Sequence, residues 1–153
     1  MNRWMENYVI RKMTPIDIDD VLYIDLQSFS HPWTREVFEQ ELIHNNYAHY
    51  YVLESEKDTI GYVGMWIVED DAQITNIAVL PSYRGRRFGE KLFSFAMQHA
   101  LQQGAKRLSL EVRVSNKIAQ NLYKKFGLVP GGIRKNYYTD NDEDALVMWV
   151  NLC

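Results

Sequence analysis

Hydrophobic and polar positions along the chain follow two different periods. In the predicted helix 86–103, apolar side chains recur every three or four residues, the spacing of one helical face. They are Leu92, Phe93, Ala96, Met97, Ala100 and Leu101. Just before this helix, β-branched residues in 74–80 predict a buried strand that Pro81 ends, because proline cannot donate a hydrogen bond to a sheet. The pattern therefore predicts a strand, a sharp turn and a helix.

The rest of the chain continues this interleaving of strands and helices. Further strands are predicted at 8–13, 50–54, 60–68, 108–112, 128–136 and 145–151. Thr14 with Pro15, Thr34, and either Ser115 or Asn116 are typical helix starts. The expected buried helical faces are Ile18, Val21, Leu22, Leu26 and Phe29, then Phe38 and Leu42, then Ile118, Ala119, Leu122 and Phe126. These elements predict an α/β fold with a mixed central sheet of about seven strands and helices on both faces.

Composition limits the classes of protein that remain. A chain of 153 residues, 46% of them hydrophobic, is expected to form one globular domain, here 1–153, because no repeat or linker marks a boundary. No apolar run is long enough to predict a membrane span, and the N-terminus lacks the apolar core of a signal peptide. With one cysteine, Cys153, we expect a cytoplasmic protein. The net charge of −3 argues against general nucleic-acid binding.

Metal binding and thiol catalysis are not indicated by the sequence. The four histidines, at positions 31, 44, 49 and 99, lack metal-ligand spacing to any acid or cysteine, so we expect no metal site. Cys153 has no base partner in the sequence, so we expect no nucleophilic role for it.

A basic turn containing two glycines joins strand 74–80 to the helix. It consists of Arg84, Gly85, Arg86, Arg87, Phe88 and Gly89. A helix start presents N–H groups without intrahelical acceptors and the positive end of the dipole, while glycine lets a phosphate approach. The turn therefore predicts an anion-binding site, although a solvated helix start is the alternative. Neither a P-loop nor a GxGxxG motif is present.

This turn resembles the Arg/Gln-x-x-Gly-x-Gly/Ala pyrophosphate loop of the GNAT acetyltransferases. Arg84 and Gly89 match its first and last positions, whereas Arg87 stands where that family usually has glycine. The segments HPW, NIAV, LEVRVSNKIAQNLYKKFGL and NYYTDNDEDALVM extend the resemblance over nearly the whole chain. They resemble the RimI type, the N-terminal alanine acetyltransferases of a ribosomal protein. The resemblance implies a GNAT fold and acetyl-CoA as co-substrate.

The resemblance also implies which residues hold acetyl-CoA. The turn would bind the pyrophosphate, and strand residues 77–79 would offer backbone groups to the pantetheine arm and thioester. Asn116 would contribute a side-chain contact, a role compatible with capping a helix. The implied cofactor-binding residues are Ile77, Ala78, Val79, Arg84, Gly85, Arg86, Arg87, Phe88, Gly89, Glu90 and Asn116.

Two residues are candidates for proton transfer. Glu111 interrupts the apolar strand LSLEV, and an acid in a buried strand is unusual because burial disfavours its charge. The pattern also allows Glu111 to face solvent with Ser109 and Arg113, or to pair with Arg113. A helical tyrosine such as Tyr123 is most often a packing residue. The resemblance, through LEVR and NLYKKFG, implies that Glu111 is a general base and Tyr123 a general acid.

The acceptor side of the site is less strongly indicated. Trp33, Tyr137 and Tyr138 resemble substrate-cleft residues of related N-terminal acetyltransferases, but core or rim packing explains them equally well. The acidic stretch 140–144 has two interpretations. It is either a solvated turn or, if it flanks the cleft, a feature that favours substrates with a basic residue just after the acetylated residue.

The resemblance implies direct acetyl transfer from acetyl-CoA to the N-terminal α-amine of an alanine-starting ribosomal protein, without a covalent enzyme intermediate. Two alternatives remain: a small amine or lysine side chain as acceptor, and a non-catalytic acyl-CoA-binding module. The presence of both Glu111 and Tyr123 argues against the second. The sequence does not indicate the oligomeric state.

Overall fold

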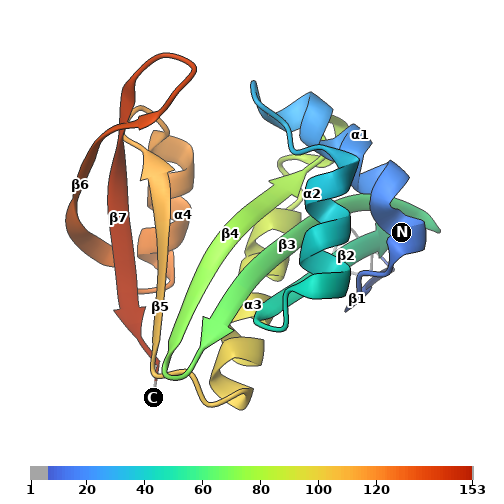
Figure 1. The fold of residues 1–153 in the computed structure, drawn as a ribbon, viewed down its shortest axis with the longest axis horizontal. Coiled ribbons are helices and arrows are strands. Elements are labelled where there is room, and N and C mark those ends of the chain that lie inside the picture. The colour runs from blue at the N-terminus through green and yellow to red at the C-terminus, as the bar shows by residue number, and fades with distance from the viewer. Residues whose placement is uncertain (1–6, 153) are drawn as a thin grey trace. The chain divides into compact units, whose positions relative to one another are not determined.

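The computed structural model describes residues 7–152 (Figure 1). Its seven strands are hydrogen-bonded in the order β1-β2-β3-β4-β5-β7-β6. They are β1 Tyr8–Lys12, β2 Ala48–Ser55, β3 Asp58–Val68, β4 Asp71–Val79, β5 Arg107–Arg113, β6 Val129–Tyr138 and β7 Glu143–Asn151. The helices of the described residues are α1 Ile18–Ser28, α2 Arg35–Glu39, α3 Phe88–Gln102 and α4 Lys117–Lys125, with short segments η2 Pro15–Asp17, η3 Gln40–His44 and η4 Pro81–Tyr83. The α/β class with about seven strands is confirmed.

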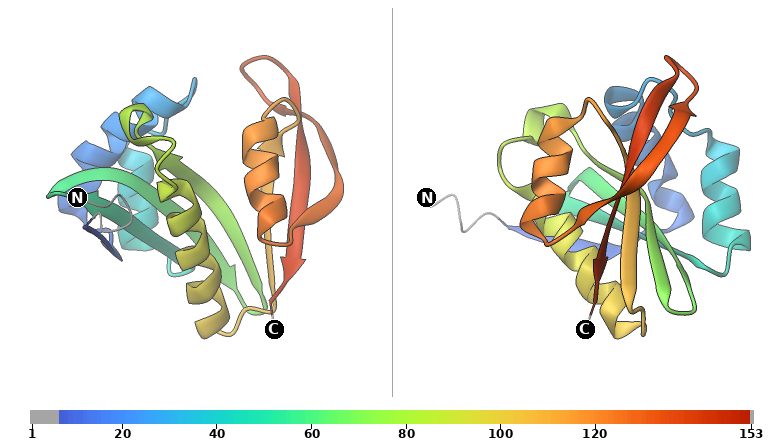
Figure 2. Two further views of the ribbon diagram at one scale, coloured as in Figure 1. Left: turned by 180° about the vertical axis from the view of Figure 1, so that it is seen from behind. Right: turned by 90° about the vertical axis from the view of Figure 1, so that its left-hand side faces the viewer.

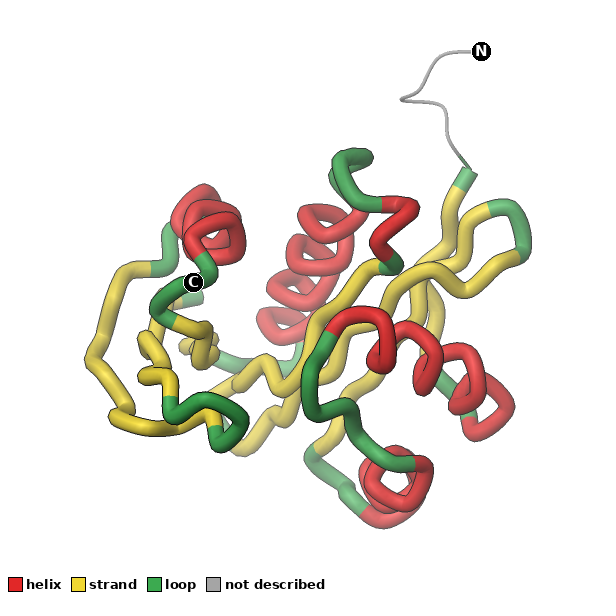
Figure 3. Tube along the Cα trace, turned by 90° about the horizontal axis from the view of Figure 1, so that it is seen from above, coloured by secondary structure: helices red, strands yellow, loops and turns green. Residues whose placement is uncertain are grey.

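The chain divides into two compact units. The N-terminal unit holds residues 1–65 and 76–93, and the C-terminal unit holds 66–75 and 94–153. Strands β3 and β4 and helix α3 therefore contribute to both units. Figure 3 distinguishes the strands from the helices that flank them.

In the N-terminal unit, β1 pairs antiparallel with β2. Helices α1 and α2 cover one face of β2 and β3 (Figure 1), and the start of α3 lies on the other (Figure 2). The strands approach closely because Gly61 has no side chain: a Cβ there would lie 2.9 Å from the Ala78 carbonyl oxygen. The buried core is made of Met13, Ile18, Val21, Ile24, Phe38, Tyr50, Val52, Tyr62 and Ala78.

The helix starts predicted from the sequence agree with the local hydrogen bonds. The Asp17 Oδ2 atom accepts a hydrogen bond from the Thr14 N–H at 2.8 Å, which anchors η2 and leads into α1. The Thr34 hydroxyl accepts from the Val37 N–H and caps α2. The buried face of α1 differs from the prediction, because Leu26 is 65% exposed. Asp25 occupies the buried position there, and a pattern that scores only apolar residues passes over it.

In the C-terminal unit, β7 lies between β5 and β6 and is antiparallel to both. Helix α4 covers one face of β5 and β7 (Figure 2). Its predicted buried face is wrong at Ile118, which is 87% exposed, and it omits Gln120 and Tyr123, which are buried. The other predicted residues, Ala119, Leu122 and Phe126, are half-buried. The Gln120 amide donates to the carbonyls of Arg113 and Val114 at 3.0 Å. A polar residue is buried here because it satisfies backbone groups where β5 ends.

Two other exposed residues also depart from the predicted faces. Phe29 follows α1 in an extended conformation and is exposed, since the helix has already ended. Leu101, in the last turn of α3, is exposed as well, whereas Leu92, Phe93, Ala96 and Ala100 are buried as predicted.

Candidate functional site

The basic turn lies in the N-terminal unit, between the end of β4 and the start of α3. Gly85 has φ +82°, and a Cβ there would meet no atom within 4 Å, so the turn is open to an approaching group at this point. The Lys91 N–H donates to the Arg87 carbonyl at 3.1 Å, the first hydrogen bond of α3. The predicted strand, turn and helix start are thus present, and anion binding by this turn stays a prediction.

Arg87 adopts φ +65°, a left-handed conformation that favours glycine. Glycine at the corresponding position of the resembling loop suits this conformation. Here an arginine adopts it, with its side chain exposed.

The neighbouring side chains of the turn are partly engaged with the protein. The Arg84 Nε atom donates to the Val79 carbonyl at 3.3 Å, and the Arg86 guanidinium lies 5.3 Å from the Tyr83 ring centre. Phe88 is buried against the rings of Tyr8 and Tyr83. Of the predicted cofactor contacts, Phe88 can therefore contribute only its backbone.

The strand residues predicted to serve the pantetheine arm are Ile77, Ala78 and Val79. The Ala78 and Val79 side chains are buried, so a ligand would use their backbone groups. Strands β4 and β5 pair in parallel over residues Asp71–Gln73 of β4, and residues 77–79 lie outside this paired stretch.

Glu111 lies in β5 of the C-terminal unit. Leu108, Leu110 and Val112 are buried, whereas Ser109, Glu111 and Arg113 are half-buried on the opposite face, as the alternation predicted. The alternative in which Glu111 pairs with Arg113 is wrong. Arg113 instead binds Asp140 and Glu143 of the β6–β7 hairpin.

The partners of Glu111 come from two other strands. The Arg134 Nη1 atom of β6 donates to Oε1 at 2.8 Å. The Gln73 amide of β4 donates to both carboxylate oxygens, at 3.1 and 3.2 Å. The sequence analysis missed both partners. Arg134 lies two residues before the NYY segment 136–138, which could have indicated it, whereas nothing in the sequence marked Gln73.

Tyr123 lies in α4, which follows β5 directly. Burial, with a smaller contribution from Tyr138, raises the pKa of Tyr123 to about 12. The phenol therefore keeps its proton at neutral pH, which a general acid requires. Tyr123 is also a buried packing residue, so the two interpretations of this residue are compatible.

Asn116 and the tyrosine pair lie in the same unit as Glu111. The Asn116 side chain caps α4 by accepting from the Ala119 N–H at 3.1 Å. The rings of Tyr137 and Tyr138 meet edge to face at 5.1 Å. Burial raises the pKa of Tyr138 to about 12, and the nearby Glu111 carboxylate adds to this shift. Glu111 and the tyrosine pair are therefore close enough to interact electrostatically.

The acidic stretch near the C-terminus is largely used inside the unit. Asp140 and Glu143 bind Arg113, whose guanidinium lies 4.0 Å from the Tyr138 ring centre. Hydrogen bonds from Ser115 lower the pKa of Glu143 to about 2. Asp144 accepts from the Asn136 N–H at 2.9 Å. These contacts favour the structural alternative over a preference for basic substrates.

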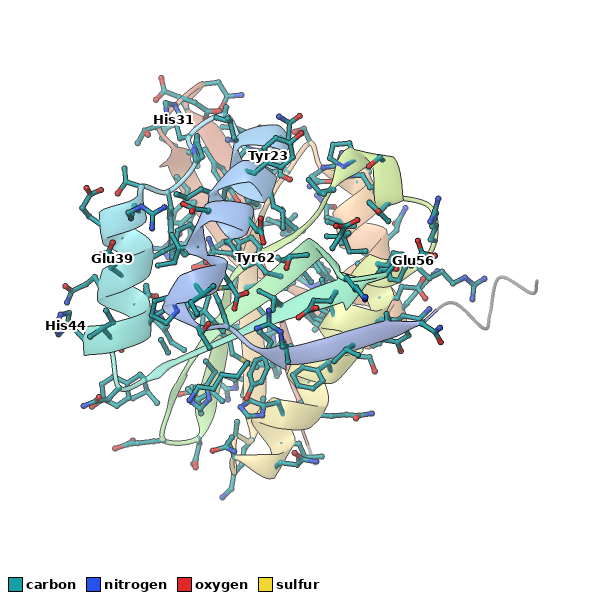
Figure 4. The ribbon with its side chains drawn as sticks, turned by 90° about the vertical axis from the view of Figure 1, so that its right-hand side faces the viewer. Tyr23, His31, Glu39, His44, Glu56 and Tyr62 are labelled. Carbon is teal, nitrogen blue, oxygen red and sulfur yellow. The ribbon has the colours of Figure 1, made fainter. Side chains whose placement is uncertain are left out.

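Trp33 lies in the N-terminal unit, half-buried against Phe38 and Tyr50. The backbone N–H of Trp33 donates to the Asp25 Oδ2 atom at 3.2 Å, and the Tyr62 hydroxyl donates to Oδ1 of the same carboxylate. Figure 4 labels Tyr62 on the strand beneath α1 and His31 in the loop after α1. Asp25 is 1% exposed, and burial raises its pKa. A buried carboxylate thus anchors the loop that carries Trp33, a role that sequence reasoning missed.

The sequence predicted no nucleophilic thiol, no metal site and no membrane span. Cys153 lies outside residues 7–152. Within them, no group of three or more His, Cys, Asp or Glu is placed to hold a metal ion. None of the helices described is both long and apolar enough to cross a membrane.

Comparison with known proteins gives further evidence on the family to which this chain belongs. Residues 18–128 match the model of the acetyltransferase (GNAT) family. A Bacillus subtilis protein, provisionally named a ribosomal protein bS18-alanine N-acetyltransferase, is 59% identical over 143 residues, covering 94% of this chain and 95% of its own. The Escherichia coli K12 ribosomal protein bS18-alanine N-acetyltransferase is 30% identical over 141 residues, covering 91% of this chain and 94% of its own.

Solved structures share the fold. The crystal structure of the Escherichia coli ribosomal-protein-S18-alanine N-acetyltransferase has a TM-score of 0.88 at 28% identity, covering 95% of this chain and 94% of its own. The NatC complex bound to Gag peptide and CoA has a TM-score of 0.84 at 21% identity, covering 96% of this chain and 99% of the matched chain. The family match spans most of the chain, and the relatives cover nearly all of it. The chain therefore belongs to the GNAT family of N-acetyltransferases.

Proposed function

We propose that this protein transfers the acetyl group of acetyl-CoA to the N-terminal α-amine of a protein. The proposed substrate is an alanine-starting ribosomal protein of the bS18 type, as the names of the relatives suggest. Such a substrate implies a cytoplasmic location. The observation that carries the proposal is the succession of Glu111 on β5 and the buried Tyr123 on α4.

The turn fits a bound pyrophosphate. Gly85 leaves open space, Arg87 is exposed, and α3 begins directly after them. In this proposal the backbone N–H groups of 84–90 hold the phosphates, and Asn116 adds a contact while it caps α4. The backbone of Ile77–Val79 orients the pantetheine arm. Bound acetyl-CoA supplies an activated acetyl group as a thioester.

Glu111 and Tyr123 then divide the proton transfers. Glu111 takes a proton from the acceptor ammonium, directly or through a water, and leaves a neutral amine. As the amine nitrogen bonds to the acetyl carbon and the carbon–sulfur bond breaks, Tyr123 donates its proton to the departing sulfur. The nitrogen then loses its second proton, which restores the phenol of Tyr123 directly or through solvent. The sulfur leaves as a thiol, and no covalent enzyme intermediate is required.

One carboxylate base is better suited to an α-amine than to a lysine. A free α-amine has a pKa near ~8, so about a tenth of it is neutral at pH 7. A lysine amine has a pKa near ~10.4, and under about a thousandth is neutral. Trp33, Tyr137 and Tyr138 are the proposed contacts to the peptide that carries the amine.

The proposal is tested by intact-mass analysis of peptides incubated with the protein and acetyl-CoA. A peptide with a free N-terminal alanine should gain one acetyl group far faster than the same peptide blocked at its N-terminus with a lysine inside. Equal rates would contradict the α-amine assignment. Thiol release measured in parallel distinguishes an enzyme from a non-catalytic acyl-CoA-binding module.

A further inference from the structure

The Glu111 carboxylate is held by two partners of different character. Gln73 is a neutral donor from β4 and contacts both oxygens. Arg134 is a cation from β6 and contacts only Oε1, at 2.8 Å. The Glu111 side chain is 11% exposed, so little of it reaches solvent beyond these contacts. A group that approaches Glu111 must therefore share or replace an existing partner.

Arg134 is the partner that can leave. Its side chain is 55% exposed, and β6 is the last strand in the sheet order, with almost all its residues exposed. An ion pair with so exposed a partner contributes little to stability. The guanidinium also lies 4.7 Å from the Tyr137 ring centre while it is paired with Glu111, so it has one favourable contact that does not depend on the carboxylate.

We propose that Arg134 is a resident cation on Glu111 that the α-ammonium of the substrate replaces. This inference rests on the proposed function, because it takes Glu111 as the base. Guanidinium and ammonium are both cationic N–H donors, so the exchange leaves Glu111 paired with a positive charge at every stage. Gln73 keeps the orientation of the carboxylate while the cations exchange.

The exchange makes Arg134 a specificity-determining residue. A neutral peptide end that displaced the guanidinium would leave Glu111 without a cation. A peptide end with a charged amine would supply a new cation to Glu111. Removal of Arg134 should therefore favour the binding of a charged peptide and have no effect on a neutral one. The gain is limited by the small contribution of an exposed ion pair, about two- to fivefold in affinity.

The test is calorimetry of full-length protein saturated with CoA, using two peptides. One has a free N-terminal alanine, and in the other a hydrogen replaces the amine. Arg134→Ala should bind the free-amine peptide about two- to fivefold more tightly and the other peptide unchanged. Lys135→Ala is the matched control, because it removes one exposed positive charge next to Arg134 on the same strand. It should change neither affinity.

Other results would overturn the exchange. Unchanged or weaker binding of the free-amine peptide would show that Arg134 is not displaced. An equal gain for both peptides would indicate a steric barrier, and a gain in Lys135→Ala would indicate a general charge effect. A fall in kcat of Arg134→Ala without tighter binding would assign Arg134 to positioning Glu111. Turnover of the free-amine peptide by the parent, measured alongside, tests the proposed function separately.

Discussion

Arg87→Gly should stabilise the protein while leaving most of the cofactor affinity intact. Arg87 adopts φ +65°, where a residue with a Cβ pays about 1–2 kcal/mol relative to the right-handed region. Glycine removes this cost but loses about 0.5–1 kcal/mol more conformational entropy on folding. The net expectation is a gain of up to about 1.5 kcal/mol in the free energy of unfolding. For a chain of this size, 1 kcal/mol corresponds to about 2–4 °C in Tm.

Cofactor binding by the same variant separates two roles for the Arg87 side chain. The side chain is exposed, and the start of α3 offers backbone donors in any case, so we expect CoA affinity to fall less than about threefold. A charge-assisted hydrogen bond to a phosphate would instead contribute about 1.5–3 kcal/mol, roughly a 10- to 150-fold change in Kd.

The assays are differential scanning calorimetry without ligand and titration calorimetry with CoA. Gly89→Glu is the companion variant, because its bulk and negative charge should weaken CoA binding strongly if this turn holds the pyrophosphate. A lower Tm in Arg87→Gly would refute the strain reasoning. A tenfold or greater loss of CoA affinity would show that Arg87 reaches a phosphate. Unchanged CoA binding by Gly89→Glu would place the anion site elsewhere.

Three further substitutions test the proton chemistry and the buried network. Tyr123→Phe should keep its fold and CoA affinity but lose about ten- to a thousandfold in kcat, and an unchanged kcat would leave Tyr123 with packing alone. Glu111→Gln should lose most kcat near pH 7 and less at higher pH, where the α-amine deprotonates itself; a loss independent of pH would assign Glu111 to positioning. Tyr62→Phe should cost about 1–3 kcal/mol in urea denaturation at pH 7, because it removes a donor to the buried Asp25 carboxylate. The pKa of Asp25 is raised in the folded protein, so its negative charge opposes folding as pH rises above the unfolded-state pKa. The cost of Tyr62→Phe should therefore be smaller near pH 3 than at pH 7. An equal cost at the two pH values would contradict this reasoning.

Several features of the fold and site could be predicted because they depend on neighbours in the chain. The strand, turn and helix start around the basic turn follow from Pro81, the glycines and the apolar period, and all are present. Thr34 and Asn116 cap their helices through bonds to residues three positions later. The alternation of β5 put Glu111 on the half-buried face correctly. These are local preferences, which a chain expresses wherever it folds.

Buried polar residues were the main failures of prediction. Asp25 and Gln120 are buried helical residues that the apolar pattern did not include in the predicted buried faces. Each is buried because a partner from elsewhere satisfies it: Tyr62 for Asp25, and two backbone carbonyls for Gln120. The cost of burying a polar group depends on that partner, and the sequence alone does not identify which residue the fold will place beside it.

The sequence by itself determined the family, the basic turn between strand and helix, and the identity of the two proton-transfer candidates, because each is carried by residues adjacent in the chain. Only the tertiary structure decided what surrounds them. Glu111 pairs with Arg134 and Gln73 across strand neighbours rather than with Arg113, two residues along its own strand. Strand register and packing bring together side chains dozens of positions apart, and the electrostatics of a carboxylate depend on those neighbours in space.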